Sequence, residues 1–218
     1  MKESIEDRLK VIVERSTRNA AIEEWRESSE KQTIPLYNYR LDHILEVVDL
    51  AKSLASETNA NLEVITLAAW LHDLAKPGVG GISAKRHGIA SAKMAKEILI
   101  AENVERNIID QVMDVIEKHV GLTKKEPLHP IEAQILWEAD KIMKLGMIGF
   151  LQGILNGVRL FPGRSLRDIT KDLHEFIPLA TEIAKCMDTE RGKKLASERL
   201  DTLKVLIKYL DEEVNVGE

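Results

Sequence analysis

Apolar residues recur at steps of three and four positions through nearly the whole chain. Two such runs are Leu41, Ile44, Val47, Val48, Ala51 and Leu54, and Leu200, Leu203, Leu206, Ile207 and Leu210. This spacing lines apolar side chains along one face of an α-helix. Because no two-residue alternation runs for five or more positions between turn signals, we predict no strand. The pattern therefore predicts an all-α fold without a significant sheet.

Capping and turn residues divide the chain into helices. Ser4 and Asp7 can form a capping pair at the start of the first helix. Helices are predicted over residues 4–28, 38–57, 62–74, 84–101 and 104–120, and from Pro130 past Asp140. Gly157, Pro162 and Gly163 mark a loop before two long C-terminal helices. The first of these two is expected to be kinked, or to end, at Pro178, because proline has no backbone N–H.

Length and composition limit the class of protein. A chain of 218 residues can bury most of its apolar surface, so we expect a single all-α domain over residues 1–218. One cysteine allows no internal disulfide, and no secretory signal or apolar run of about 20 residues is present. These features predict a cytoplasmic protein without a membrane span. Acidic and basic residues are evenly mixed, 36 against 31, so duplex nucleic acid is not an expected partner.

The adjacent pair His72 and Asp73 stands at the end of an apolar helix, just before a Lys-Pro-Gly break. Neighbouring side chains on a helix diverge by about 100°, so they can meet at one point only where the backbone ends or is distorted. This pair lies at such a place. By itself it is a weak signal, because helix ends often use His or Asp to bond their own backbone.

Four further polar residues occupy apolar helix faces: His43, His87, His119 and Asp140. Each has a structural explanation, since a core histidine can bond a carbonyl and a buried aspartate can pair with Lys or Arg. Together with the His72 and Asp73 pair, however, they are the residue types that hold a metal ion. The two remaining histidines, at positions 129 and 174, are expected to lie outside the site.

The order His43, His72 with Asp73, and Asp140 on successive helices resembles the H…HD…D signature of the HD-domain superfamily of metal-dependent phosphohydrolases. The stretch HDLAKP is also close to the HD-x-x-K form common there. The resemblance covers about residues 37–146, half of the chain. It implies a helical bundle of the HD-domain type, with a metal-binding core over residues 37–146 and flanking helices on both sides.

The resemblance also implies a ligand set. In that arrangement His43, His72, Asp73 and Asp140 hold a first metal ion. Asp73 bridges to a second ion held by His87 and His119, so that one or two ions bind per chain. Mixed nitrogen and oxygen ligands suit a divalent transition metal, namely Mn, Fe, Ni or Zn, better than Ca.

The function implied is cleavage of a phosphoester or phosphoanhydride, in a small phosphorylated substrate such as a nucleotide, by metal-activated water. We expect Asp73 and Lys76 to be catalytic, and Arg40, Lys76 and Arg86 to bind the substrate. We expect cationic side chains in these roles because negative charge develops on the phosphoryl oxygens during the reaction. The glycine-rich loop from Pro77 to Ser83 is a candidate to close over the substrate.

Other functions stay open. Di-iron oxygenases of the same superfamily use a similar ligand set, and a non-catalytic module that senses a nucleotide is a further alternative. A helical scaffold without any site would require all six candidate ligands to be coincidental. The motifs do not name the substrate, although Phe150, Phe161 and Phe176 are candidates to stack on a ring. The long amphipathic terminal helices are compatible with a homo-oligomer.

Overall fold

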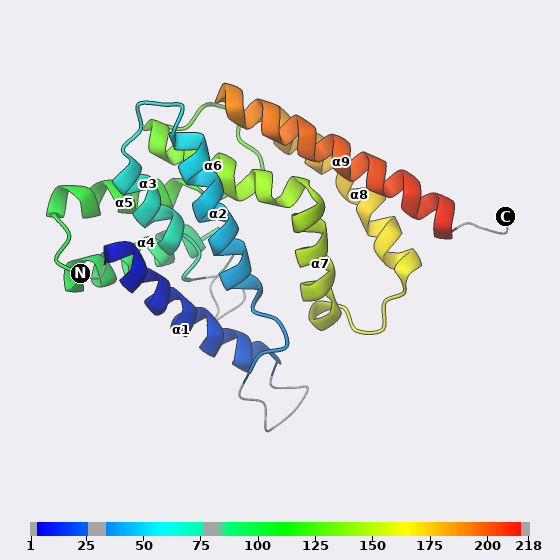
Figure 1. Ribbon diagram of the computed structural model, residues 1–218, viewed down its shortest axis with the longest axis horizontal. Helices are drawn as coiled ribbons and strands as arrows, with labels where there is room; N and C mark the ends of the chain where they lie inside the picture. Colours follow the sequence, from blue (N-terminus) through cyan, green and yellow to red (C-terminus); the bar gives the residue numbers. More distant parts are fainter. Residues whose placement is uncertain (1–3, 26–33, 76–82, 84, 215–218) are drawn as a thin grey trace. The chain divides into compact units, whose positions relative to one another are not determined.

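A computed structural model describes residues 4–25, 34–75, 83 and 85–214, and it confirms the all-α prediction (Figure 1). The elements in chain order are α1 (Ile5–Trp25), α2 (Tyr39–Ala55), α3 (Leu62–Leu71), α4 (His87–Ala101), α5 (Arg106–Lys118), α6 (Ile131–Ile142), the 3₁₀ turn η2 (Met143–Leu145), α7 (Met147–Leu160), α8 (Leu166–Lys185) and α9 (Glu190–Val214). None of the described helices is long and apolar enough to cross a membrane.

Side-chain caps fix the first turns of several helices. The Ser4 hydroxyl accepts a hydrogen bond from the Asp7 amide at 3.1 Å and donates one to the Asp7 carboxylate at 2.6 Å, which confirms the predicted capping pair. The Asn38 side chain caps α2, and the Asn61 side chain caps α3. Each cap satisfies backbone N–H groups that have no partner inside the helix.

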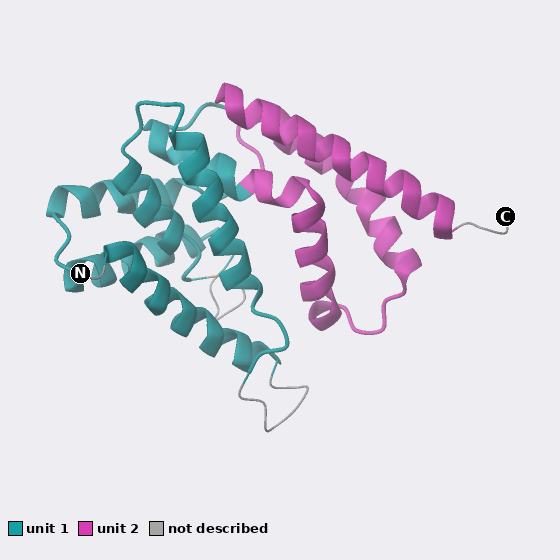
Figure 2. Cartoon of the chain, in the orientation of Figure 1, with its two compact units in different colours: residues 1–121, 126–140 teal, residues 122–125, 141–218 magenta. Residues whose placement is uncertain are grey.

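The chain divides into two compact units, which Figure 2 shows in different colours. Unit 1 comprises residues 1–121 and 126–140, and unit 2 comprises residues 122–125 and 141–218. The division falls inside α6, between Asp140 and Lys141. The single domain expected over residues 1–218 stays a prediction.

Helix α3 forms the centre of unit 1. It contacts α1, α2, α4 and α5, and its residues from Val64 to Leu71 are buried with the exception of Thr66. A helix that is apolar on all sides is stable in water only when neighbours cover every face. The residues that follow α3 are therefore delivered into the interior of the unit.

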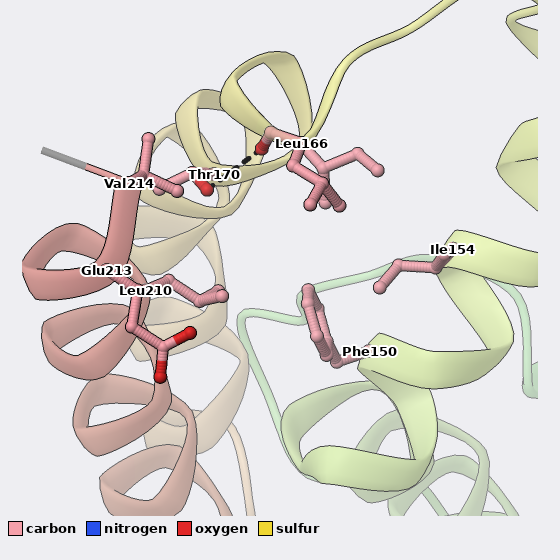
Figure 3. A pocket seen from close by; sticks show the side chains of 8 residues that line it. Phe150, Ile154, Leu166, Thr170, Leu210, Glu213 and Val214 are labelled. Atoms are coloured by element: carbon pink, nitrogen blue, oxygen red, sulfur yellow. Dashed lines mark hydrogen bonds between the residues drawn. The ribbon is translucent and has the colours of Figure 1, made fainter. Parts of the chain in front are cut away.

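Unit 2 contains η2 and helices α7, α8 and α9. Helix α9 packs against α8 and α7, and a capping box between Ser165 and Asp168 fixes the start of α8. A mainly apolar pocket lies among the three helices (Figure 3). It is lined by Phe150, Ile154, Leu166, Ile169, Thr170, Leu210, Glu213 and Val214.

The predicted break at Gly157 is wrong, and of the two alternatives at Pro178 the end of the helix is wrong. Gly157 lies inside α7, which continues to Leu160. A glycine costs a helix about 1 kcal/mol, which is too little to end it. Helix α8 continues through Pro178 to Lys185. The cost of about 3 kcal/mol for a proline inside a helix is offset by the face of α8, including Leu173 and Ile183, that is buried in unit 2.

Candidate metal centre

The six predicted ligand residues converge inside unit 1, and they come from or next to five helices. His43 belongs to α2, His72 is the C-cap of α3 and Asp73 follows it, His87 opens α4, His119 is the C-cap of α5, and Asp140 lies near the end of α6. All are buried except His87, which is half-buried. The end of α3 at Leu71 confirms that the His72 and Asp73 pair lies where the helix stops.

The Asp73 carboxylate lies between two sets of imidazoles. Its Oδ2 is 3.9 Å from Nε2 of His43. Its Oδ1 is 3.6 Å from Nε2 of His87 and 3.7 Å from Nε2 of His119. The two oxygens of one carboxylate therefore face different histidines, an arrangement in which a carboxylate can bridge two ions.

These contacts define two adjacent subsites. In subsite 1, ligand atoms of His43, His72 and Asp73 all lie within 4.8 Å of one another. Asp140 adjoins it, because its Oδ1 is 3.1 Å from Nε2 of His43. In subsite 2, ligand atoms of Asp73, His87 and His119 meet the same 4.8 Å limit. Asp73 belongs to both subsites.

Backbone carbonyls fix the tautomers of two histidines. Nδ1–H of His72 donates to the Ala69 carbonyl at 2.8 Å, and Nδ1–H of His119 donates to the Ile116 carbonyl at 2.6 Å. Both histidines stand just after a helix, where the last carbonyls lack intrahelical partners. With the proton on Nδ1, the neutral ring keeps a lone pair on Nε2, which is the usual preparation of a histidine ligand.

The donor set fits a divalent cation. Nε2 of His72 is buried and has no hydrogen-bond partner within the described part of the chain. Burial lowers the pKa of His72 to about 3, so this nitrogen stays unprotonated at neutral pH. A buried lone pair without a partner is costly, and a cation would satisfy it.

Subsite 2 has spacing that also suits an ion. Nε2 of His87 and Nε2 of His119 are 3.0 Å apart. Two nitrogens each about 2.1 Å from one metal ion, with bonds at right angles, would be separated by about 3.0 Å. The rings meet edge to face, with centroids 4.9 Å apart.

The three predicted cationic residues lie in different surroundings. Arg40 is buried, and its guanidinium pairs with the Glu24 carboxylate of α1. Arg86 is exposed directly before His87. Lys76 and the loop from Pro77 lie outside the described residues, apart from the exposed Ser83. Substrate binding by Arg40, Lys76 and Arg86 stays a prediction, as does catalysis by Lys76.

The two histidines that were placed outside the site and the three candidate phenylalanines are not among the residues of the two subsites. His129 is exposed before Pro130, and His174 pairs with Asp211 of α9 at 2.9 Å. Of the three candidate phenylalanines, Phe150 lines the pocket of unit 2. Phe161 lies 5.0 Å from the guanidinium carbon of Arg164. A role in stacking on a substrate stays a prediction for all three.

His87 reaches the cluster, but not because it lies on a buried apolar face of its helix. That face would include Met94, seven positions later, which is exposed. The buried face of α4 instead runs through Gly88, Ala95 and Leu99. His87 reaches Asp73 because it occupies the first position of α4. At a helix end, the direction of a side chain depends less on which face of the helix is buried.

Sequence analysis missed two residues that adjoin the cluster. The Tyr39 ring lies parallel to the His43 imidazole, with centroids 5.9 Å apart. Their spacing of four positions on one helix was a usable signal. The buried Ser91 hydroxyl accepts a hydrogen bond from the Ala75 amide at 3.1 Å and so ties the turn after Asp73 to α4. A single sequence contains no signal for that contact.

Replacing Ser91 with alanine is expected to lower the free energy of unfolding by about 1–3 kcal/mol, because the Ala75 amide then stays buried without its acceptor. Urea unfolding of the metal-free protein measures this change. Ser56→Ala is the matched control, because Ser56 is exposed and its hydroxyl bonds the Ser53 carbonyl at the surface. We expect that control to stay within about 0.5 kcal/mol of the wild type. An equal effect of both substitutions would contradict a special role of Ser91.

Comparison with known sequences identifies the same part of the chain. Residues 40–144 match the HD domain. A curated relative, the tRNA (cytidine(56)-2'-O)-methyltransferase of Thermoplasma volcanium, is 29% identical over 164 residues, which cover 69% of this chain. The match covers 45% of that relative, so the chain spans less than half of its length.

Two solved structures share the fold. YpgQ of Bacillus subtilis, in complex with ADP, is 20% identical with a TM-score of 0.66, and the match covers 96% of this chain and 98% of that one. An HD-superfamily hydrolase of Bacillus thuringiensis is 22% identical with a TM-score of 0.62, over 95% of this chain and 98% of the other. The chain therefore contains an HD domain over residues 40–144, and the HD motif residues of this stretch gather in unit 1.

Proposed function

We propose that the protein is a divalent-metal-dependent phosphohydrolase that cleaves a phosphoester or phosphoanhydride bond of a nucleotide. The observation that carries the proposal is the position of the Asp73 carboxylate, whose two oxygens face separate sets of histidines. A cluster of this composition, buried and with an unpartnered Nε2 on His72 among the described residues, is suited to cations and not to core packing.

The proposed ligands follow the two subsites. His43, His72, Asp73 and Asp140 would hold one ion, and Asp73, His87 and His119 a second. The mixture of imidazole nitrogens and carboxylate oxygens favours Mn, Fe, Ni or Zn. When bound, such ions lower the pKa of water and neutralise charge on a phosphoryl group, which is the chemistry that this hydrolysis requires.

The protein's own groups orient the site and supply charge. The Ala69 and Ile116 carbonyls hold the rings of His72 and His119 with the proton on Nδ1, which leaves a lone pair on each Nε2 for a cation. Asp73 acts as a shared ligand and not as a nucleophile. Arg86, exposed beside His87, and Lys76 are proposed to bind the phosphoryl oxygens, because their cationic groups would offset the negative charge there.

The nucleotide part of the proposal has separate support. YpgQ, which shares the fold across nearly its whole length, was solved in complex with ADP. A shared fold alone does not show that two proteins bind the same ligand. We propose a nucleotide for this chain because the shared fold is combined with a site suited to phosphate.

The test is turnover by protein stripped with a chelator and reloaded with Mn²⁺, Fe²⁺, Ni²⁺ or Zn²⁺. Release of phosphate or pyrophosphate is measured from nucleoside mono-, di- and triphosphates and from bis(p-nitrophenyl) phosphate. We expect release that depends on the metal, at least about 100-fold above the stripped protein.

Three results would contradict the proposal. No release with any metal would exclude this hydrolysis. Oxygen uptake by the iron-loaded protein with candidate diols or phosphonates, without phosphate release, would indicate the di-iron oxygenase. Nucleotide binding without turnover would indicate a sensing module.

A further inference from the structure

The first turn of α4 lies unusually close to the last turn of α5, at Gly88. A Cβ atom at this position would lie 2.6 Å from Cγ2 of Val120 and 3.2 Å from the carbonyl oxygens of Ile116 and Glu117. Gly88 is buried, so no movement toward solvent relieves these contacts. Of the three atoms, only the Val120 methyl can give way easily, because the other two belong to the backbone of the α5 terminus.

This close approach occurs beside both histidines of subsite 2. His87 immediately precedes Gly88, and His119 immediately precedes Val120. The Ile116 carbonyl that a Cβ would press on is the acceptor for Nδ1–H of His119. A side chain at position 88 would therefore disturb the spacing of the two Nε2 atoms, now 3.0 Å, and the bond that orients one of the rings.

The atoms of subsite 1 lie on other elements. His43 belongs to α2, Asp140 to α6, and His72 to the end of α3. None of them supplies one of the three atoms nearest to a Cβ at Gly88. A change at position 88 therefore acts first on subsite 2. It reaches subsite 1 through the shared Asp73 and through the His119 ring, whose centroid is 5.1 Å from that of His72.

We propose that Gly88 is a positioning residue for subsite 2: the absence of a side chain lets α4 and α5 approach until His87 and His119 can bind one ion. The proposal rests on the two-ion centre of the proposed function. In this proposal, binding of the second ion depends on how closely the two helices pack as well as on the ligand residues.

The experiment compares Gly88→Ala with the wild type in Mn²⁺ titrations that are monitored by calorimetry and by electron paramagnetic resonance. The wild type is expected to bind two Mn²⁺ with the spectrum of a coupled pair. For Gly88→Ala we expect the second dissociation constant to rise by at least about tenfold and the coupled spectrum to give way to that of isolated ions. The first dissociation constant should change by less than about threefold.

Gly153→Ala is the matched control. Gly153 also lies inside a helix, but a Cβ there meets nothing within 4 Å. The same substitution at this position should leave both Mn²⁺ dissociation constants and the coupled spectrum unchanged. It separates the effect of the close approach from the general effect of alanine in place of glycine.

A second variant tests the cause and covers the case in which Gly88→Ala does not fold. Val120→Ala removes the methyl carbon that lies 2.6 Å from the added Cβ. The double variant Gly88→Ala/Val120→Ala is therefore expected to regain the coupled spectrum and at least part of the affinity for the second ion that Gly88→Ala loses. Val120→Ala alone is the reference for this comparison.

The outcomes are distinct. A wild type that binds one Mn²⁺ or none refutes the two-ion centre, and with it the proposed function in this form. A wild type with two ions, together with a folded Gly88→Ala that keeps the second ion at unchanged affinity, refutes only the role of Gly88. Equal weakening of both ions, or no recovery in the double variant, also overturns that role.

Discussion

Asp73→Asn is expected to abolish phosphate release almost completely, with a fall of about a thousandfold or more in kcat/KM. Among the described residues, Asp73 is the one that belongs to both groups of candidate ligands, and its carboxylate lies 3.6–3.9 Å from three histidines. The amide has nearly the same shape but no negative charge, so both ions lose a shared anionic ligand. A loss of several kcal/mol of charge stabilisation corresponds to a rate change of that size.

Initial rates at saturating Mn²⁺, together with the metal content of the purified protein, measure this effect. Asp110→Asn is the matched control, because Asp110 is an exposed carboxylate on α5 that pairs with Arg106. The control should keep its rate within about twofold, as expected for a surface pair. If Asp73→Asn stayed within tenfold of the wild type while binding two ions, the central role of this carboxylate would be untenable.

The helices and most of the ligand cluster could be predicted because both depend on local pattern. Apolar spacing places His119 and Asp140 on buried faces, and the structure has both buried. The break after His72 follows from an apolar helix that runs into a Lys-Pro-Gly sequence. Periodicity identifies which face of a helix is inward, and the residue types that can hold a metal then select the cluster from the inward polar residues.

The remainder depends on which helices are neighbours, and a single sequence does not contain that information. The Ser91 contact with the Ala75 amide and the Gly88 contact with Val120 join residues from different elements. The pair of Arg40 with Glu24 of α1 is a further contact of this kind, and substrate binding by Arg40 stays a prediction. Helix α8 does not end at Pro178, because burial of the α8 face exceeds the local cost of proline.

Acid is expected to destabilise the metal-free protein through His72. Burial lowers the pKa of His72 from its ordinary value of 6.5 to about 3. Between these values the unfolded chain binds a proton that the folded chain does not, so the unfolded state is favoured as pH falls. This contribution to stability is complete above about pH 6.5 and decreases toward pH 3, by at most about 1.4 kcal/mol per pH unit.

His72→Asn isolates this effect, because the asparagine amide can donate to the Ala69 carbonyl in place of Nδ1 while the titrating ring is absent. Urea unfolding in a chelator, from about pH 6.5 to 4.5, should show the wild type losing stability relative to the variant along that slope. A difference independent of pH would contradict the buried neutral ring.

At neutral pH, Mn²⁺ at about 100 times its dissociation constant should stabilise the wild type by about 2.7 kcal/mol. Mn²⁺ should stabilise the His72→Asn variant clearly less, because this variant lacks the Nε2 atom of subsite 1. In the wild type, no described group is hydrogen-bonded to that atom, so it is available as a ligand.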